Sequence, residues 1–457
     1  MADLPEFIPT DTADIQLGRV SITHLEQADD VVLMSTTAEG LQRKLDGMSR
    51  WCAKNFMLFN ASKSAVMIIG GRAKHAALFS VGVGEGERVE IGVVATVTYL
   101  GITLSSRTDQ FMRKHYTDKA AMAKRASRVI SGVQQLVGTL PVQVATHLYM
   151  ALVDPHLTHG CEVVLDHVDG AREEMEAVQN MFVRKVIRVG MRCMEVILFT
   201  ETGLIPIRYR RLEFSLRFLV YATQCPRGHY VREAMEEAVK LDFGGDKSWI
   251  SDLRTTIQRL PFHCAFPTHD LLGDPDVVGH LIKIVRDGAR VDLQRRVEAS
   301  PKLYLLHGRM EKDEDGGLTR TVPVFLRHYL KVANPAHRVA LSQVLLSGHK
   351  YAVETGRRGK SYRARVDRTC RLCNQVVETP EHVWLECDVA GQLVQLRRDM
   401  VGDVGALCTP NELDWMTEAD GDIVETMKRL VALRSAVSRV AQYAFDVSRF
   451  MAREVQW

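Results

Sequence analysis

The sequence predicts an α+β protein whose first 105 residues are rich in β-structure and whose remaining residues are mostly helical. Runs of β-branched and aromatic residues, separated by glycine-containing turns, are concentrated before residue 105. After residue 109, apolar residues recur at helical spacing and signals for strands become rare. The chain has 457 residues, of which 46% are hydrophobic and 25% charged, and this length suits roughly two to four domains.

The β-rich part begins with a predicted hairpin at residues 15–35, which has a polar tip at residues 27–30. Residues 36–39, Thr-Thr-Ala-Glu, are typical of a capping box, so we expect a helix to begin there. The helix presents one apolar face, formed by Leu41, Leu45, Met48 and Cys52.

Two further β segments complete the first part. A strand is predicted at residues 65–69, and a second β segment at residues 96–104, with a glycine-rich loop at residues 82–86 between them. The glycines of that loop lack the strand–glycine–helix setting of a dinucleotide-binding turn. The predicted order is therefore ββαβ plus a hairpin.

The second part is predicted to be helical. Helices are expected at residues 109–137, 141–153, 171–190 and 207–224, with weaker signals over 231–345 and helices again over 388–457. No apolar run of 18 residues occurs and no signal peptide is recognisable, so we expect no membrane partner. Six of the nine cysteines are isolated, which indicates a reducing intracellular compartment rather than a disulfide framework.

The sharpest local pattern is a set of metal-ligand residues, Cys370-x2-Cys373-x8-His382-x4-Cys387. A Cys-x2-Cys turn lets two thiolates converge on one ion, and a later His and Cys can complete a tetrahedron. Three thiolates and one imidazole leave no open position, which is typical of a structural Zn²⁺ rather than a catalytic one. The alternatives are a chance Cys pair beside an ordinary histidine, or a redox pair.

Two segments carry an excess of positive charge. Residues 107–128 contain seven Lys or Arg residues and two acidic residues. Residues 350–371 contain eight Lys or Arg residues and two acidic residues. Such segments suit nucleic acid, because each cation placed against a phosphate releases counterions. The candidate contacts are Arg113, Lys114, Lys124, Arg125, Arg128, Arg357, Arg358, Lys360 and Arg363, with Tyr351 and Tyr362 as stacking platforms. The alternative is that both segments are solvated faces without a ligand.

Two adjacent carboxylates, Asp29 and Asp30, occupy the tip of the first hairpin. Adjacent carboxylates repel each other unless they are solvated or a cation lies beside them. Mg²⁺ bound by one or two carboxylates and by substrate phosphates is the usual arrangement in phosphoryl transfer. By itself the pair is also compatible with an ordinary solvated turn, since the chain has 56 acidic residues.

Five motifs occur in an order that resembles the reverse transcriptases of non-LTR (LINE-like) retrotransposons. They are the Ala28-Asp29-Asp30 hairpin, the Asn-Ala-Ser-Lys-Ser segment at 60–64, the Val-Thr-Tyr-Leu-Gly-Ile segment at 97–102, the basic helical segment at 109–165 that ends in His-Gly-Cys-Glu, and the Cys-Cys-His-Cys knuckle. The resemblance spans roughly residues 10–220 and 350–390. It implies an RNA-directed DNA polymerase with RNA and DNA as partners and the nucleus as its compartment.

The resemblance also implies domain limits and site residues. The limits are a partial palm at 1–105, a thumb at 106–165, a helical connector at 166–345, a basic arm with the zinc knuckle at 346–392 and a C-terminal helical region at 393–457. Asp29 is implied to be a Mg²⁺ ligand, with Asp30 in the same site and Lys63 near the triphosphate. Tyr99, Leu100 and Gly101 are implied to form the primer grip.

The sequence departs from that family before Asp29, which only 28 residues precede. Two-metal polymerisation needs another carboxylate from a separate strand, and the resemblance places this strand, a glycine gating loop and the fingers upstream. Asp3, Asp11 and Asp14 lie in an N-terminal segment that is too short to contain that strand, the gating loop and the fingers. We therefore expect an incomplete polymerase, inactive alone, with a complementing upstream fragment as a further partner.

Three readings of the function remain open at this point. The first is the C-terminal portion of a reverse transcriptase. The second is a non-catalytic nucleic-acid-binding protein that uses the thumb and the zinc knuckle. The third is a soluble helical protein whose knuckle is purely structural.

Overall fold

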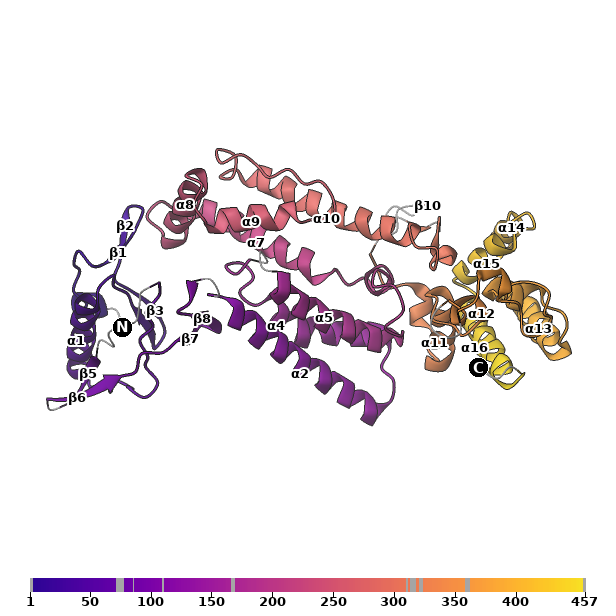
Figure 1. Ribbon diagram of the computed structural model, residues 1–457, viewed down its shortest axis with the longest axis horizontal. Helices are drawn as coiled ribbons and strands as arrows, with labels where there is room; N and C mark the ends of the chain where they lie inside the picture. Colours follow the sequence, from indigo (N-terminus) through magenta and orange to yellow (C-terminus); the bar gives the residue numbers. More distant parts are fainter. Residues whose placement is uncertain are drawn as a thin grey trace. The chain divides into compact units, whose positions relative to one another are not determined.

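The computed structural model describes residues 3–454, except 71–77, 85, 109–110, 166–168, 310, 313–317, 320–323 and 358–361. Within these residues the chain is a mixture of helices and small antiparallel strand pairs (Figure 1), which confirms the α+β class at this level. It divides into two compact units. The first comprises Met1–Ala121, Thr158–Glu174 and Arg211–Ile284, and the second comprises Met122–Leu157, Met175–Arg210 and Val285–Trp457.

The predicted hairpin at residues 15–35 is in fact two consecutive hairpins. Their strands are β1 (Ile15–Leu17), β2 (Val20–Ile22), β3 (His24–Gln27) and β4 (Asp30–Leu33). The second hairpin has a two-residue turn in which Ala28 adopts a φ of 52°, and Gln27 pairs with Asp30 across it. The acidic pair therefore lies at a hairpin tip, as predicted.

Helix α1 (Ala38–Lys54) follows the second hairpin, and its amino end differs from the prediction. The N-cap is Thr37, whose side-chain oxygen accepts a hydrogen bond of 3.1 Å from the backbone N–H of Gly40. The predicted capping box at residues 36–39 is wrong, because the third helical residue is Gly40, which has no side chain to reach back to the cap. The predicted apolar face is confirmed, since Leu45 and Cys52 are buried in the core beneath the helix.

The segment after α1 contains a hairpin over residues 79–91, and the glycine-rich loop predicted at residues 82–86 overlaps it. Strands β5 (Phe79–Gly84) and β6 (Glu87–Ile91) pair in antiparallel fashion, with an irregularity between Gly82 and Gly84. The strand predicted at 65–69 is wrong, because only an isolated bridge between Val66 and Val93 forms there. The N–H of Gly82 donates to Ser49 Oγ on α1 at 2.9 Å, which joins β5 to the helix. The glycines hid this strand in the sequence because glycine is usually depleted in strands.

The last β segment of the first unit is the predicted hairpin at residues 96–104. It consists of β7 (Thr96–Tyr99) and β8 (Ile102–Ser105), joined by Leu100 and Gly101 at φ values of 48° and 77°. Each sheet within the described ranges has only two strands. A two-stranded hairpin is marginal by itself, so these strands depend on packing against helices such as α1.

The remaining elements are mostly helices, as predicted, apart from a short antiparallel hairpin of β9 (Glu311–Lys312) and β10 (Leu318–Thr319). The helices include α2 (Arg113–Val137), α3 (Val142–Leu148), the π-helical turn η3 (Tyr149–Val153), α4 (Asp154–Thr158), α5 (Asp169–Ile187), α6 (Ile197–Thr200), α7 (Ile207–Gln224), α8 (Tyr230–Phe243), α9 (Trp249–Gln258) and α10 (Pro275–Glu298). None of the described helices is long and apolar enough to cross a lipid bilayer.

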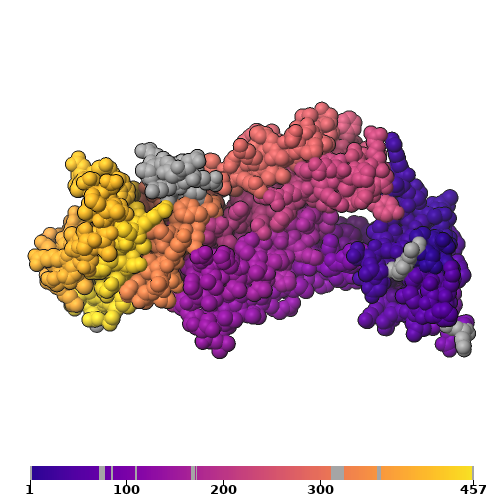
Figure 2. All heavy atoms as spheres, turned by 180° about the vertical axis from the view of Figure 1, so that it is seen from behind, coloured from indigo at the N-terminus to yellow at the C-terminus, as the bar shows by residue number. Residues whose placement is uncertain are grey.

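The C-terminal helices belong to the second unit. They are α11 (Pro335–Leu345), α13 (Gly391–Leu407), α14 (Pro410–Thr417), α15 (Ile423–Ala432) and α16 (Val437–Glu454), and α16 contacts α11, α13 and α15. In the space-filling view the orange and yellow atoms of this part of the chain form one continuous mass (Figure 2). One face of α16 is buried throughout, with Val440, Ala444, Val447 and Met451 in the core. The predicted zinc-knuckle domain at 346–392 and the predicted C-terminal region at 393–457 lie in this same unit rather than in separate ones.

Candidate metal centre and nucleic-acid interface

The Cys370–Cys373 turn is shaped by backbone hydrogen bonds before any ion is considered. An antiparallel bridge between Thr369 and Val377 closes the turn. Within it, the N–H of Cys370 donates to the carbonyl of Val376 at 2.6 Å, and Asn374 adopts a φ of 58°. Asparagine tolerates this left-handed conformation better than most residues, which suits it to such a tight turn.

The four predicted zinc ligands lie together. The Sγ atoms of Cys370, Cys373 and Cys387 and a ring nitrogen of His382 are all within 4.8 Å of one another. Cys370 Sγ is 3.9 Å from Cys387 Sγ, and Cys373 Sγ is 3.5 Å from His382 Nε2. With Zn–S bonds of about 2.3 Å and Zn–N bonds of about 2.0 Å, the edges of a tetrahedron are about 3.8 Å for two sulfurs and about 3.6 Å for sulfur and nitrogen. The observed spacing therefore suits one tetrahedral ion and excludes a disulfide.

The second part of the centre fixes the orientation of the imidazole. His382 begins the π-helical turn η8 (His382–Glu386), and its Nδ1 lies 3.2 Å from Glu386 Oε2. A carboxylate on the far ring nitrogen is the usual support of a metal-bound histidine, because it sets the tautomer that leaves Nε2 free for the ion. The residues present therefore fit a structural Zn²⁺, and the sequence pattern did not point to Glu386.

The two thiols of the Cys-x2-Cys turn differ in acidity. Burial raises the pKa of Cys370 to about 12. Burial also opposes ionisation of Cys373, but hydrogen bonds from the backbone N–H groups of Gln375 and Val376 and from His382 lower its pKa to about 7. Cys373 is thus the thiol most ready to meet a cation as a thiolate.

The centre is also built into the helical core of the second unit. Trp384, in η8, is fully buried, and its indole N–H donates to the hydroxyl of Tyr351 at 3.0 Å. The Trp384 carbonyl accepts hydrogen bonds from Arg397 on α13 at 2.7 Å and from Tyr443 on α16 at 2.6 Å. Metal binding at η8 is therefore connected directly to the packing of both helices.

Several residues of the predicted basic arm have structural roles. The buried guanidinium of Arg368 donates to the carbonyls of Arg363 and Val353. Arg371 pairs with the fully buried carboxylate of Glu378. Of the predicted nucleic-acid contacts here, Arg357 pairs with Glu354 at 3.0 Å, Arg363 is exposed, and Arg358 and Lys360 lie outside the described residues.

One of the two predicted stacking platforms is wrong. Tyr351 is buried beside Trp384, so its ring is not available to a base, whereas Tyr362 is 66% exposed. The two tyrosines lie in one basic segment and look equivalent in sequence. The partner that buries Tyr351 lies 33 residues further along the chain.

The acidic tip is fully solvated. Asp29 and Asp30 are both exposed, and neither carboxylate forms a hydrogen bond or an ion pair in the part of the chain that the structure describes. No third carboxylate, histidine or cysteine joins them into a metal-ligand group there. Lys63 is exposed in the turn after α1, and no ion pair joins it to either aspartate. The predicted magnesium site thus rests on the resemblance alone.

One of the predicted primer-grip residues, Tyr99, is affected by the charge of the acidic tip. Burial raises the pKa of Tyr99, and the nearby carboxylate of Asp30 raises it further, so the two side chains are electrostatic neighbours. On the other side of the turn, a Cβ added to Gly101 would lie 2.8 Å from His159 Nε2. The ring of His115, on α2, lies within hydrogen-bond distance of the His159 carbonyl at 3.0 Å.

The basic side of α2 faces solvent. The predicted contacts Arg113, Lys114, Lys124, Arg125 and Arg128 are all exposed. Tyr116, Ala120, Ala123 and Ile130 are buried on the opposite side of the helix. Lys114 forms an ion pair with Asp118 at 2.8 Å, one helical turn away. Within the residues that the structure describes, no carboxylate forms an ion pair with the other four cations, so this face attracts anions.

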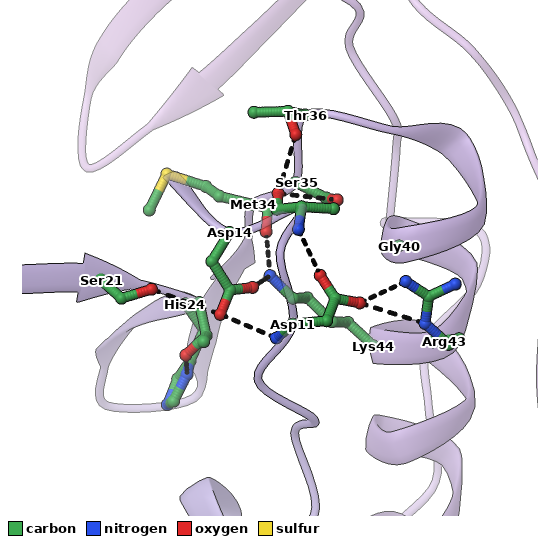
Figure 3. A network of polar contacts seen from close by, with 12 residues as sticks. Asp11, Asp14, Ser21, His24, Met34, Ser35, Thr36, Gly40, Arg43 and Lys44 are labelled. Atoms are coloured by element: carbon green, nitrogen blue, oxygen red, sulfur yellow. Dashed lines mark hydrogen bonds and ion pairs between the residues drawn. The ribbon is translucent and has the colours of Figure 1, made fainter. Parts of the chain in front are cut away.

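Sequence reasoning missed a buried ion pair in the N-terminal lead-in (Figure 3). Lys44 on α1 is completely buried, and its Nζ lies 2.6 Å from Asp14 Oδ1. The same ammonium group donates to the carbonyl of Met34. Asp14 Oδ2 accepts hydrogen bonds from the N–H of Asp11 at 3.1 Å and from Ser21 Oγ at 3.3 Å. Asp14, which the sequence placed in a lead-in too short for catalysis, is therefore a structural anchor.

The comparisons with known proteins add no family to this geometry. The chain matches no protein-family description, no curated protein and no solved structure.

Proposed function

We propose that this chain binds nucleic acid and corresponds to the palm, thumb and zinc-knuckle portion of a non-LTR reverse transcriptase. The observation that carries the proposal is the close approach of the Gly101 turn to His159, whose carbonyl lies 3.0 Å from the ring of His115 on α2. The resemblance implies that the grip turn lies beside the thumb and the acidic hairpin, and this approach, together with the effect of Asp30 on the pKa of Tyr99, supports that arrangement.

The exposed basic side of α2 supports nucleic acid as the ligand. Lys124, Arg125 and Arg128 are exposed within little more than one helical turn, and a duplex presents one negative charge per about 1.7 Å of its axis. Three cations on a rigid helix can therefore contact neighbouring phosphates together. The resemblance makes an RNA–DNA hybrid the duplex to test first.

We expect the Lys124→Gln, Arg125→Gln, Arg128→Gln triple variant to bind an RNA–DNA hybrid with a weaker dependence on salt. Losing three phosphate contacts lowers the slope of log K against log salt by about 2 to 3. Fluorescence anisotropy over a series of salt concentrations measures this slope.

The matched control removes the same charge elsewhere. Lys185, Arg227 and Lys247 are exposed and form no ion pair with any residue that the structure describes. Replacing all three by glutamine should leave the slope nearly unchanged. Equal slopes for the two triple variants, or binding that does not respond to salt, would refute the proposal.

A second expectation separates a catalytic portion from a binding portion. Within the described residues, Asp29 and Asp30 have no third carboxylate beside them, whereas two-metal phosphoryl transfer needs ions held firmly in place. We therefore expect the pure chain to incorporate no deoxynucleotides on a primed RNA template. Incorporation that Asp29→Ala abolishes would show that the chain is a polymerase by itself.

A further inference from the structure

The second unit contains a pocket of about 510 Å³ that the proposed function does not use. Its lining comes from α3, η3, the first residue of α4, the turn at residues 202–205, Arg210 on α7 and the segment at 325–331. Sites for small molecules have volumes of roughly 300–1,000 Å³ and combine apolar walls with a few polar groups. The pocket is of this kind, and every residue of its lining belongs to the same compact unit.

A buried polar cluster holds two walls of the pocket together. Glu201 is fully buried and accepts hydrogen bonds from Arg309 at 3.0 Å and from the hydroxyl of Tyr329 at 2.7 Å. The backbone carbonyl of Glu201 accepts from the N–H of Arg327 at 3.0 Å. Burial alone would raise the pKa of Glu201, but the guanidinium groups of Arg309 and Arg327 hold it at about 2. A network of this type fixes a site before its ligand arrives.

The turn between these walls requires glycine. Gly203 has a φ of 79°, and a Cβ at this position would lie 2.8 Å from the Cα of Phe325. Thr202 also forms an antiparallel bridge with Leu326. The turn and the 325–331 segment are therefore in direct backbone contact, which gives the pocket a defined shape rather than a loose opening.

The lining of the pocket combines two kinds of chemistry. Its apolar residues include Leu204, Ile205 and Phe325. It also carries two cations, Arg210 and the exposed Lys331. Arg210 Nε donates to the buried carboxylate of Asp154 at 2.9 Å, so the arginine is held in place while its side chain remains 29% exposed. Because the charge of Arg210 is balanced by Asp154, the net positive charge of the lining comes from Lys331.

We propose that this pocket binds a nucleoside monophosphate, with the base against Leu204, Ile205 and Phe325 and the phosphate near Lys331 and Arg210. A planar apolar body joined to an anion matches a lining that combines apolar side chains with two cations. The inference rests on the proposed function in one respect: a protein that binds nucleic acid makes a nucleotide the first ligand to consider. The nucleotide has two sources, a free mononucleotide or one unit of a single strand whose base is splayed out.

Isothermal titration calorimetry with uridine 5′-monophosphate tests the proposal on the full chain. We expect saturable binding of the nucleotide at one site. Uridine and inorganic phosphate should each bind more weakly by about tenfold or more, because uridine lacks the anion for the cations and phosphate lacks the base for the apolar residues. Lys331→Glu should weaken nucleotide binding by about tenfold or more. Ile205→Trp should abolish it, because the larger side chain fills the space beside the apolar residues from a position that is 41% exposed.

Lys185→Glu is the matched control, since it makes the same charge change at an exposed residue outside the pocket. Competition with a short oligouridylate identifies the source. If the oligomer displaces the mononucleotide, the pocket takes one unit of a strand, and if it does not, the ligand is a free nucleotide. Nucleotide binding that is absent, or that survives both Lys331→Glu and Ile205→Trp, overturns the inference. The salt dependence conferred by α2 would persist in that case, so the two proposals fail separately.

Discussion

Loss of metal from the four-ligand centre is expected to unfold the C-terminal helices of the second unit. We expect the purified chain to contain one equivalent of zinc and Cys373→Ser to contain almost none. Without the ion, two buried thiols remain 3.9 Å apart, and the π-helical turn that carries Trp384 loses the ligand that holds it. Structural zinc sites contribute about 10–16 kcal/mol of binding free energy in small peptides, so a loss of stability on the order of 5 kcal/mol is a conservative expectation here.

The measurements are metal content after purification and urea unfolding with and without a chelator. Cys408→Ser is the matched control, because Cys408 is a partly buried free cysteine of the same unit that lies outside the centre. It should keep its zinc and most of its stability. Less than one equivalent of zinc in the original chain, or equal unfolding midpoints for the two serine variants, would show that no structural zinc is bound.

The clustering of Cys370, Cys373, His382 and Cys387 could be predicted because its information is local. Four ligands within 18 residues, at spacings that a tight turn and one helical turn impose, leave few other geometries. The long helices could be predicted for a similar reason, since a helix repeats its apolar face every few residues. Helix α7 therefore has the bounds that its periodicity predicts, Ile207–Gln224.

The features that could not be predicted depend on partners far apart in the chain. Glu201 meets Arg309 across 108 residues and Tyr329 across 128, and no local pattern indicates that a charged residue will be buried with both. The burial of Tyr351 could not be predicted for the same reason, since Trp384, which packs beside it, lies 33 residues further along the chain. The strand at Phe79–Gly84 could not be predicted for a different reason, because glycines are generally depleted in strands, and the partner strand and the bond to Ser49 on α1 become visible only in three dimensions.

The second large effect is expected at the ion pair that anchors the N-terminal lead-in to α1. Lys44→Met should destabilise the first unit by about 3–5 kcal/mol, because it leaves the carboxylate of Asp14 buried without a counter-charge. The side chains of Lys44 and Asp14 are 0% and 2% exposed, so water cannot replace the lost partner. Urea unfolding measures the loss of stability, and hydrogen exchange of the α1 amides shows whether that loss is located at α1.

Arg43→Met is the matched control one residue away. Arg43 pairs with Asp11 through Nε at 3.1 Å, but its side chain is 52% exposed, and a pair of this kind contributes only about 0–1 kcal/mol. Combining Asp14→Asn with Lys44→Met should recover much of the stability, since the double variant buries no unpaired charge. Asparagine still offers one oxygen to the N–H of Asp11 and the hydroxyl of Ser21. Equal losses for Lys44→Met and Arg43→Met would mean that α1 holds the lead-in through its apolar contacts at Leu4, Ile8 and Trp51 instead.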